Sequence, residues 1–352
     1  MRSAAASVVL AGAVLATSCS EPSRPIRVAI HSAPIDLDPH FQNESLTLGI
    51  LGNIYEGLTD FDEVLGTRPR LAESWTNPDE RTWVFRLRRG VRFHDETPVG
   101  AQDVVRSLER ARSVEGSALA SYLVEVETLR ALDERTVEIR TRRPFAALLA
   151  RLAQVYVVPR DAPARIVSPV GTGPYRLVRY GGGVLELAPA GTSTGESRGV
   201  TPVTFVVEPD ADARLRKLLA GEVDVAANLP GTSVAVLRGS GSCRAEVLPG
   251  STVEYLHFAW IDARFRDRRV REAIHLAIDR VAYVAEAHGG LGQPISQMAA
   301  PGVFGYAPDL RPPARDVARG RALLAEAGHP EGFDGVREPR PGRRGDVRAP
   351  SG

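Results

Sequence analysis

The clearest hydrophobic pattern in the chain runs over residues 82–88, where apolar and polar positions alternate. Trp83, Phe85 and Leu87 fall on one face, and the intervening positions fall on the other. An alternation with a period of two is typical of a half-buried β-strand. We therefore expect a strand here, with its aromatic face turned to a core.

Helical spacing dominates three other segments. Gly100 is placed to cap a helix that has Asp103 in its first turn, because an acidic group stabilises a helix N-terminus. A second pattern predicts one long helix from Arg268 to His288, with Asp267 as its cap and Gly289 as its stop. A third predicts a helix over Val317–Ala327, between Asp316 and Gly328. The inward stripe of the first helix comprises Val104, Val105, Leu108 and Ala111.

Shorter apolar runs between turn residues predict further elements, so that strands and helices are mixed along the chain. We expect strands at Ile26–Ile30, around Leu129–Arg140 as a hairpin, at Tyr175–Tyr180 and Val184–Ala188 around a glycine turn, and at Val253–Ala259, with a helix at Leu215–Leu219. The fold class predicted from this mixture is α/β.

Composition narrows the function classes. At 352 residues the chain is long enough for two domains, and 43% hydrophobic and 25% charged residues are ordinary for a globular protein. The formal net charge of +1 gives no electrostatic case for binding nucleic acid.

The N-terminus has the pattern of a secretory signal. Arg2 precedes an apolar run over residues 4–16, which is too short to span a membrane. Small residues lead into Cys19, which predicts a lipoprotein signal peptide over residues 1–19, lipidation of Cys19 and anchoring to a membrane. The alternative is cleavage nearby with Cys19 as a bystander. With Cys19 lipidated, Cys243 has no disulfide partner.

Several separated motifs occur in a fixed order, and together they resemble one family. The chain is similar to the extracytoplasmic solute-binding proteins of ABC transporters, family 5, the peptide/nickel-binding group that includes dipeptide- and oligopeptide-binding proteins. The resemblance covers about residues 26–334. The motifs are Leu37–His40, Tyr55–Leu58, Leu71–Trp75, Phe93–Asp95 with Thr97–Pro98, Gly171–Tyr175, Leu219–Asp224, Tyr255–Phe258, Val270–Ala273 with Ala277–Arg280, and Leu323–Gly328.

The resemblance implies a two-lobed periplasmic-binding-protein-like fold of type II with an extra N-terminal subdomain. Lobe I would comprise residues 20–44 and 166–255, with the extra subdomain inserted at 45–165. Residues 256–334 would begin lobe II and leave it incomplete, and the Arg/Pro/Gly-rich residues 335–352 are expected to be disordered because they are poor in large apolar residues.

The chain departs from the family pattern at two places. Glu96 stands where the family has glycine in a turn, and a positive φ there would cost about 1 kcal/mol. The motifs also end at Asp334, which we interpret as a frameshift or premature stop. The alternative is a natural short form whose partner lobe is supplied elsewhere.

For function, the resemblance implies a periplasmic or cell-surface binding component of an ABC importer. It would capture short peptides by closure of two lobes, deliver them to the permease subunits, act as a monomer and need no cofactor. Alternative ligands are nickel, haem or oligosaccharide, and the alternative to all of these is a non-functional fragment. Ligand contacts implied by position are Gln42, Asn43, Glu44, Ser45, Leu119, Tyr122, Tyr255, His257 and Trp260.

Two of these residues have a structural alternative. Trp260 could stack on a ligand or cap the hinge between lobes, and His257 is more simply interpreted as a histidine satisfied within a strand. No acidic partner for a peptide amino terminus is found in the second-lobe part of the sequence.

Enzymatic functions find little support in the sequence. Gly191–Gly195 fits the G-x-S-x-G pattern, but Pro189 before it and Gly199 and Pro202 after it exclude the strand and helix of a nucleophile elbow. The seven histidines show no metalloenzyme motif, and no phosphate-binding loop of an ATPase occurs. We expect no catalytic residue and no metal ligand.

Overall fold

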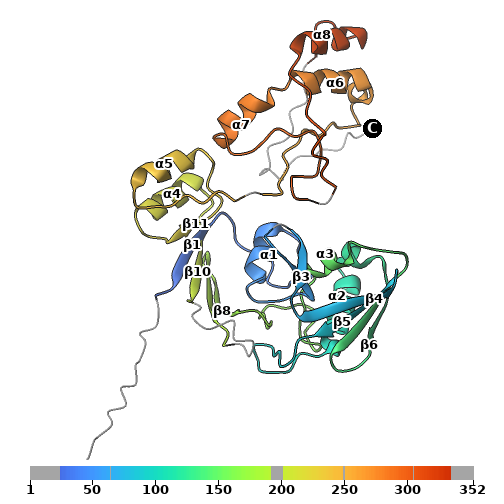
Figure 1. Ribbon diagram of the computed structural model, residues 1–352. Coiled ribbons are helices and arrows are strands. Elements are labelled where there is room, and N and C mark those ends of the chain that lie inside the picture. The colour runs from blue at the N-terminus through green and yellow to red at the C-terminus, as the bar shows by residue number, and fades with distance from the viewer. Residues whose placement is uncertain (1–23, 64, 192–200, 249, 304, 334–352) are drawn as a thin grey trace, which may run out of the picture. The chain divides into compact units, whose positions relative to one another are not determined.

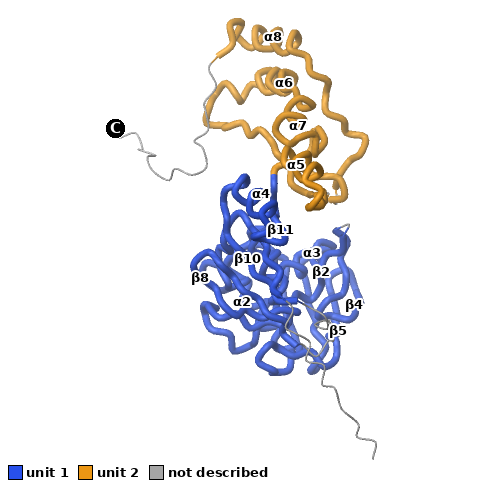
Figure 2. Tube along the Cα trace, turned by 90° about the vertical axis from the view of Figure 1, so that its left-hand side faces the viewer, with its two compact units in different colours: residues 1–229 blue, residues 230–352 orange. Residues whose placement is uncertain are grey.

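The computed structural model describes residues 24–63, 65–191, 201–248, 250–303 and 305–333, which Figure 1 draws in colour. The chain divides into two compact units, unit 1 over residues 1–229 and unit 2 over residues 230–352, coloured blue and orange in Figure 2. The signal segment with Cys19, residues 192–195 of the G-x-S-x-G pattern and the tail after 334 lie outside the described residues. The finer division into lobes and subdomain stays a prediction.

Unit 1 contains a five-stranded mixed sheet in the order β11-β1-β10-β9-β8. β1 runs parallel to both of its neighbours, while β9 and β8 add an antiparallel hairpin. The strands at Ile26–Ile30, Tyr175–Tyr180 and Val184–Ala188 are thereby confirmed. The strands are β1 (Ile26–Ile30), β8 (Tyr175–Gly181), β9 (Val184–Pro189), β10 (Val203–Val207) and β11 (Val225–Ala226).

A second layer of unit 1 is a four-stranded antiparallel sheet in the order β4-β5-β7-β6, covered by α2. Phe85 of β5 is fully buried and Trp83 and Leu87 nearly so, which confirms the predicted aromatic face. The helix after Gly100 and its apolar stripe are confirmed too. The elements are β4 (Ala72–Asp79), β5 (Thr82–Leu87), α2 (Ala101–Ser113), β6 (Val126–Ala131) and β7 (Thr136–Thr141).

The remaining elements of unit 1 are short, and one helix is longer than predicted. α4 begins at Ala211, well before Leu215, because the Asp210 side chain caps it by accepting from the Ala213 amide at 2.6 Å. The others are α1 (Ser45–Leu51), β2 (Thr59–Phe61), β3 (Thr67–Pro69), the 3-10 helix η1 (Ala120–Leu123), α3 (Leu148–Leu152) and α4 (Ala211–Leu219).

The Gly171–Tyr175 motif joins the two layers, because the Gly171 carbonyl also accepts from the amide of His94, which follows Phe93 of the other layer's core, at 2.9 Å. The amides of Gly173 and Tyr175 donate to the carbonyls of Ile54 and Asn53 at 2.9 and 3.0 Å. A Cβ on Gly171 would lie 2.0 Å from the Ile54 oxygen, and one on Gly173 would lie 2.4 Å from the Asn53 oxygen. Only glycine fits at these two positions, so the motif is required by packing.

Glu96 has a φ of 69°, so the turn does require the positive φ that was considered for this position. Its amide donates to the Phe93 carbonyl at 2.9 Å, and the Arg92 guanidinium donates to the Glu96 carbonyl at 2.6 Å. These hydrogen bonds hold a conformation that glutamate disfavours and glycine would adopt freely.

Unit 2 is helical where it is regular, and the single long helix predicted over Arg268–His288 is wrong. The chain forms two helices, because Ile278 leaves the helical conformation with a ψ of 122° and Asp279 begins the next helix by accepting from the Ala282 amide at 2.9 Å. The helix ending near Ala327 is confirmed. The elements are α5 (Ser233–Ser240), η2 (Ala263–Arg266), α6 (Arg268–Ala277), α7 (Arg280–His288) and α8 (Val317–Glu326).

The strand predicted at Val253–Ala259 is also wrong. These residues are described, yet they form no strand, and no described segment pairs with them. Tyr255 and Leu256 are 64% and 58% exposed. An apolar sequence of this kind becomes a strand only when a neighbouring strand supplies hydrogen bonds.

Candidate ligand-binding site

Four of the predicted contacts, Gln42, Asn43, Glu44 and Ser45, form the loop that enters α1. Glu44 caps this helix: its carboxylate accepts from the amides of Leu46 and Thr47, both at 2.8 Å, and from the Thr47 hydroxyl at 2.9 Å. Burial acts to raise the pKa of Glu44, but these hydrogen bonds outweigh it and lower the pKa below the ordinary value. The loop therefore carries a fixed negative charge.

Gln42 differs from its neighbours because its side chain is 3% exposed. Its Oε1 accepts from the Glu44 amide at 3.0 Å. Its Nε2 is buried and has no hydrogen-bond partner within the described part of the chain. Asn43 and Ser45 on either side are exposed. The loop thus offers one oriented donor between accessible polar side chains.

A buried polar network lies directly before this loop. Asp38, fully buried, accepts from both terminal nitrogens of Arg110 at 3.0 and 2.5 Å and from the Ile166 amide at 2.9 Å. The Arg110 guanidinium also donates to the carbonyl of Ala164 at 3.0 Å. The buried Asp38 carboxylate thus has two hydrogen bonds to Arg110 and one to an amide. Together with Arg110 it ties α2, the Asp38 turn and residues 163–166 to one another.

His40 belongs to the same network and is fully buried. Its Nδ1 lies 2.8 Å from Arg110 and its Nε2 lies 2.9 Å from the Tyr156 carbonyl. Because guanidinium only donates, Nδ1 accepts and Nε2 carries the proton. Burial lowers the pKa of His40 to about 4, so the ring is neutral at physiological pH. It holds the loop and carries no charge.

Leu119 and Tyr122 lie near this loop, because the Ala118 amide donates to the His40 carbonyl at 3.0 Å. The Leu119 side chain is fully buried in the core of the four-stranded sheet, so it is not accessible to a ligand. Tyr122 is half-buried, and the Arg151 guanidinium stacks over its ring at 4.7 Å.

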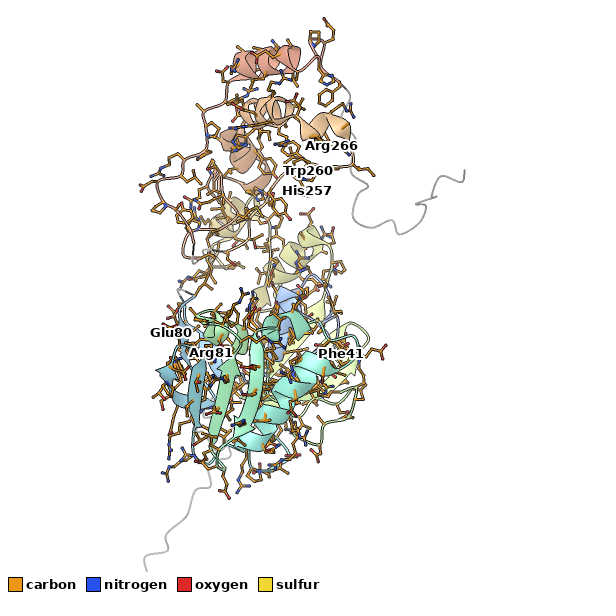
Figure 3. The ribbon with its side chains drawn as sticks, turned by 90° about the vertical axis from the view of Figure 1, so that its right-hand side faces the viewer. Phe41, Glu80, Arg81, His257, Trp260 and Arg266 are labelled. Carbon is orange, nitrogen blue, oxygen red and sulfur yellow. The ribbon has the colours of Figure 1, made fainter. Side chains whose placement is uncertain are left out.

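Unit 2 carries the other three predicted contacts on one irregular segment. Figure 3 labels His257 and Trp260 there, and Tyr255 precedes them. His257 is exposed, and its alternative interpretation as a satisfied strand histidine is wrong because no strand forms. Trp260 is 58% exposed, with the Arg271 guanidinium over its ring at 5.0 Å. The structure therefore groups the predicted residues into two sets, one in each unit.

The chain matches the family model of bacterial extracellular solute-binding proteins, family 5 Middle, over residues 66–348. The chain belongs to family 5. The match continues past Asp334, where the motifs recognised in the sequence end. Members of this family are extracellular solute-binding proteins of bacteria, and they are not enzymes.

Curated relatives agree with this assignment. The glutathione-binding protein GsiB of Escherichia coli O1:K1 / APEC is 30% identical over 347 residues, covering 94% of this chain and 67% of that protein. The GsiB of Shigella dysenteriae serotype 1 is 29% identical over 334 residues, covering 91% of this chain and 64% of that protein. The family 5 chain thus spans about two thirds of the length of these relatives.

Solved structures confirm the predicted α/β periplasmic-binding-protein-like fold of type II. AgaA in complex with agropinic acid, from A. tumefaciens R10, is 26% identical with a TM-score of 0.73, covering 88% of this chain and 65% of that one. DppA from Helicobacter pylori in complex with the peptide STSA is 23% identical with a TM-score of 0.72, covering 88% and 67%, and supports the fold alone.

The sequence missed a cluster at the carboxyl ends of the parallel strands of this family 5 protein. His31 follows β1, Glu208 follows β10 and Asn228 follows β11 closely. Arg214 of α4, 3% exposed, binds the carbonyls around the last two. Strand pairing brings these residues together, and no local sequence signal marks them. The signal available in principle was the rule that ligands bind at this edge of parallel strands.

Neither of two surface hollows formed by the described residues, of about 330 and 270 Å³, is lined by any predicted contact residue. Within these residues no group of three or more His, Cys, Asp or Glu side chains is placed to hold a metal ion. No described helix is both long and apolar enough to cross a bilayer.

Proposed function

We propose that this chain is the binding component of an ABC importer and that it captures short peptides outside the cytoplasmic membrane. The observation that carries the proposal is the family match over residues 66–348, together with the oriented donor that unit 1 presents at Gln42. Delivery to permease subunits and action as a monomer are parts of the same proposal.

Peptide backbone chemistry fits the loop at α1. A peptide carbonyl oxygen needs a donor, and Gln42 Nε2 is a buried donor with no other described partner. A peptide amino group needs an acceptor, and the Glu44 carboxylate keeps its charge because its pKa is lowered. Such contacts are made to the main chain of the peptide and not to its side chains, so peptides of varied sequence can be bound.

Glutathione is a specific second candidate for the ligand. The relatives named for glutathione binding are 29–30% identical to this chain. Glutathione is itself peptide-like, so the two candidates share their chemistry and differ in length and charge. Agropinic acid, bound by AgaA, extends the range to other amino-acid derivatives.

The membrane anchor remains part of the proposal. Lipidation at Cys19 would tether the binding units outside the membrane next to the permease. Mass spectrometry of the protein from a bacterial membrane fraction tests this, because a diacylglyceryl group on Cys19 adds a defined mass. A soluble product cleaved elsewhere, with an unmodified cysteine, contradicts it.

Isothermal calorimetry tests the ligand class. The full chain is titrated with a dipeptide, a tetrapeptide, glutathione, agropinic acid and nickel ion, and we expect saturable binding of at least one of the two peptides. Gln42→Leu should weaken that binding about tenfold, because one buried hydrogen bond to the ligand is lost. Val178→Ala, a change of an exposed residue in β8, is the matched control and should leave affinity unchanged.

The remaining outcomes decide between the alternatives. Binding of glutathione without either peptide replaces the ligand class and keeps the transport role. Nickel binding alone replaces it with the metal. Absence of saturable binding by a folded chain contradicts the proposal and supports the non-functional alternative.

A further inference from the structure

Three segments meet at the carboxyl edge of the parallel strands in unit 1. The Glu208 amide donates to the Ile30 carbonyl at 2.8 Å, and the Ala227 amide donates to the Ala29 carbonyl at 2.9 Å. These hydrogen bonds connect the end of β1 to the ends of both neighbouring strands. His31 is the first residue after β1, so it lies next to these strand ends. In open α/β sheets, this edge is where ligands bind.

Arg214 makes this edge rigid. Its guanidinium donates to four main-chain carbonyls at 2.7 to 3.2 Å, and the side chain is 3% exposed. Asn228, one of the four acceptors, has a φ of 55°, in the left-handed region that asparagine adopts more readily than most residues. The four carbonyls belong to Glu208, Pro209, Ala227 and Asn228.

His31 has a polar atom that the fold does not use. Its Nδ1 is buried and has no hydrogen-bond partner among the described residues, although the ring as a whole is half-buried. An unpaired buried polar atom is unfavourable, so each one in a native structure calls for a partner, such as a water, an ion or a ligand.

The same ring lies close to the loop at α1. Burial raises the pKa of the Glu44 carboxyl, the hydrogen bonds from Leu46 and Thr47 lower it, and the nearby His31 lowers it further. The Ile35 amide, shortly after His31, donates to the Thr47 hydroxyl at 3.0 Å and ties the two loops together. His31 Nδ1 and Gln42 Nε2 are thus two unused buried polar atoms on adjoining loops of one unit.

We infer that His31 contacts the ligand directly and, with Gln42, donates hydrogen bonds to a peptide carbonyl oxygen. Gln42 Nε2 only donates, and imidazole Nδ1 donates when it carries its proton. A neutral carbonyl suits this position better than a carboxylate, because the Glu44 carboxylate nearby repels negative charge. The assignment rests on the proposed peptide function and adds a specificity-determining residue to it.

Three variants of the full chain test the inference in calorimetry with the peptide that the unaltered chain binds. His31→Leu should weaken binding about tenfold, since a buried donor is replaced by an apolar group. His31→Asn should stay within about threefold, because the asparagine amide places a donor where Nδ1 stood. Ile26→Ala, at the other end of the same strand, should leave affinity unchanged. Equal affinity in His31→Leu and the unaltered chain overturns the inference and leaves the proposed function standing.

If the chain binds no peptide, that result contradicts the proposed function and does not test the assignment of His31. A measurement without ligand then tests that assignment. Urea unfolding of His31→Leu, followed by tryptophan fluorescence, should show a midpoint equal to or higher than that of the unaltered chain, because replacing an unpaired polar group by an apolar one does not destabilise. A clearly lower midpoint shows that the fold needs the imidazole, and the assignment of His31 to the ligand is then wrong.

Discussion

The two units bury apolar side chains to very different extents. Among the described residues, unit 2 contributes only five buried apolar side chains: Leu237, Val270, Ala273, Ala300 and Leu323. It also exposes several large ones, with Ile261 at 92%, Val281 at 72% and Met298 at 65%. Unit 1 contains both extended clusters of buried residues, one under each sheet. We therefore expect a larger free energy of unfolding for unit 1 than for unit 2, which is held together by few buried apolar contacts.

The difference follows from how each unit forms the hydrogen bonds of its backbone. Unit 1 pairs its strands in two sheets of five and four strands, each with a covered face. Unit 2 has helices of about ten residues and a long irregular segment before α6. Isolated helices of that length are marginal in water, so their packing decides whether they persist. Large apolar side chains exposed in unit 2, such as Ile261 and Val281, favour association with other chains.

The largest expected effect lies in the core of unit 1. Phe85→Ala should lower the free energy of unfolding by about 4 kcal/mol, because a fully buried aromatic ring leaves a cavity between the sheet and α2. Urea unfolding in a Trp260→Phe background reports unit 1, since the other two tryptophans, Trp75 and Trp83, lie there. Val281→Ala, at an exposed site of unit 2, is the control and should change stability by less than about 0.5 kcal/mol.

A smaller effect, confined to unit 2, is expected from Leu323→Ala. Leu323 is 3% exposed in α8, which packs closely on α6: a Cβ on Gly320 would lie 3.0 Å from the Ala273 carbonyl. The loss should be about 2 kcal/mol. Hydrogen exchange measured on peptides should show faster exchange in α6 and α8 and unchanged exchange in β5. Equal loss of protection in both units would show that they unfold as one and would contradict the comparison. Leu310→Ala, half exposed, serves as the control.

Acid should destabilise unit 1 through His40. The pKa of this histidine is about 4 in the fold and ordinarily about 6.5, so between these values the unfolded chain takes up a proton that the folded chain does not. Stability is thus lost as the pH falls from 6.5 toward 4, by up to about 1.4 kcal/mol per pH unit. His94, whose pKa burial also lowers, adds a slope of the same sign. His40→Gln removes only the His40 part, and an unchanged slope in this variant would refute the assignment.

The smallest effect compares two turns of unit 1. Glu96→Gly should raise the free energy of unfolding by about 1 kcal/mol, because Glu96 has a φ of 69°. Glu80→Gly, in the hairpin turn labelled in Figure 3, should lower it by a similar amount, because φ is negative there and glycine only adds freedom to the unfolded chain. Thermal unfolding of the two variants should therefore shift in opposite directions, and shifts of the same sign would contradict the strain assigned to Glu96.

Local patterns predicted unit 1 well because its elements obey local rules. The alternation over residues 82–88 and the stripe of α2 match their burial. In unit 2 the apolar spacing alone favoured one helix through Asp279, although an aspartate in that position also caps a new helix. The failure at Val253–Ala259 has a different cause, since a strand requires a partner that no local pattern supplies.

The candidate site was likewise predicted from the sequence only in part. Positions 42–45 came from the family resemblance, and the structure adds that one of the four is buried with an unused donor. His31 could not be found from the sequence, because its neighbours Glu208 and Asn228 are brought to it only by the register of β1 with β10 and β11. Pairing across nearly two hundred residues leaves no mark in the residues around position 31.

The two glycines of the Gly171–Tyr175 motif lie against the carbonyls of Asn53 and Ile54 with no room for a side chain. The motif is thus a joint between layers of the scaffold, and its hydrogen bonds go to the backbone of that scaffold. Two proteins can have the same sequence in this motif and still bind unrelated ligands. For a chain of this family, the motifs that identify the family therefore say little about which ligand is bound, and the residues that select the ligand are to be sought in the loops at the strand ends.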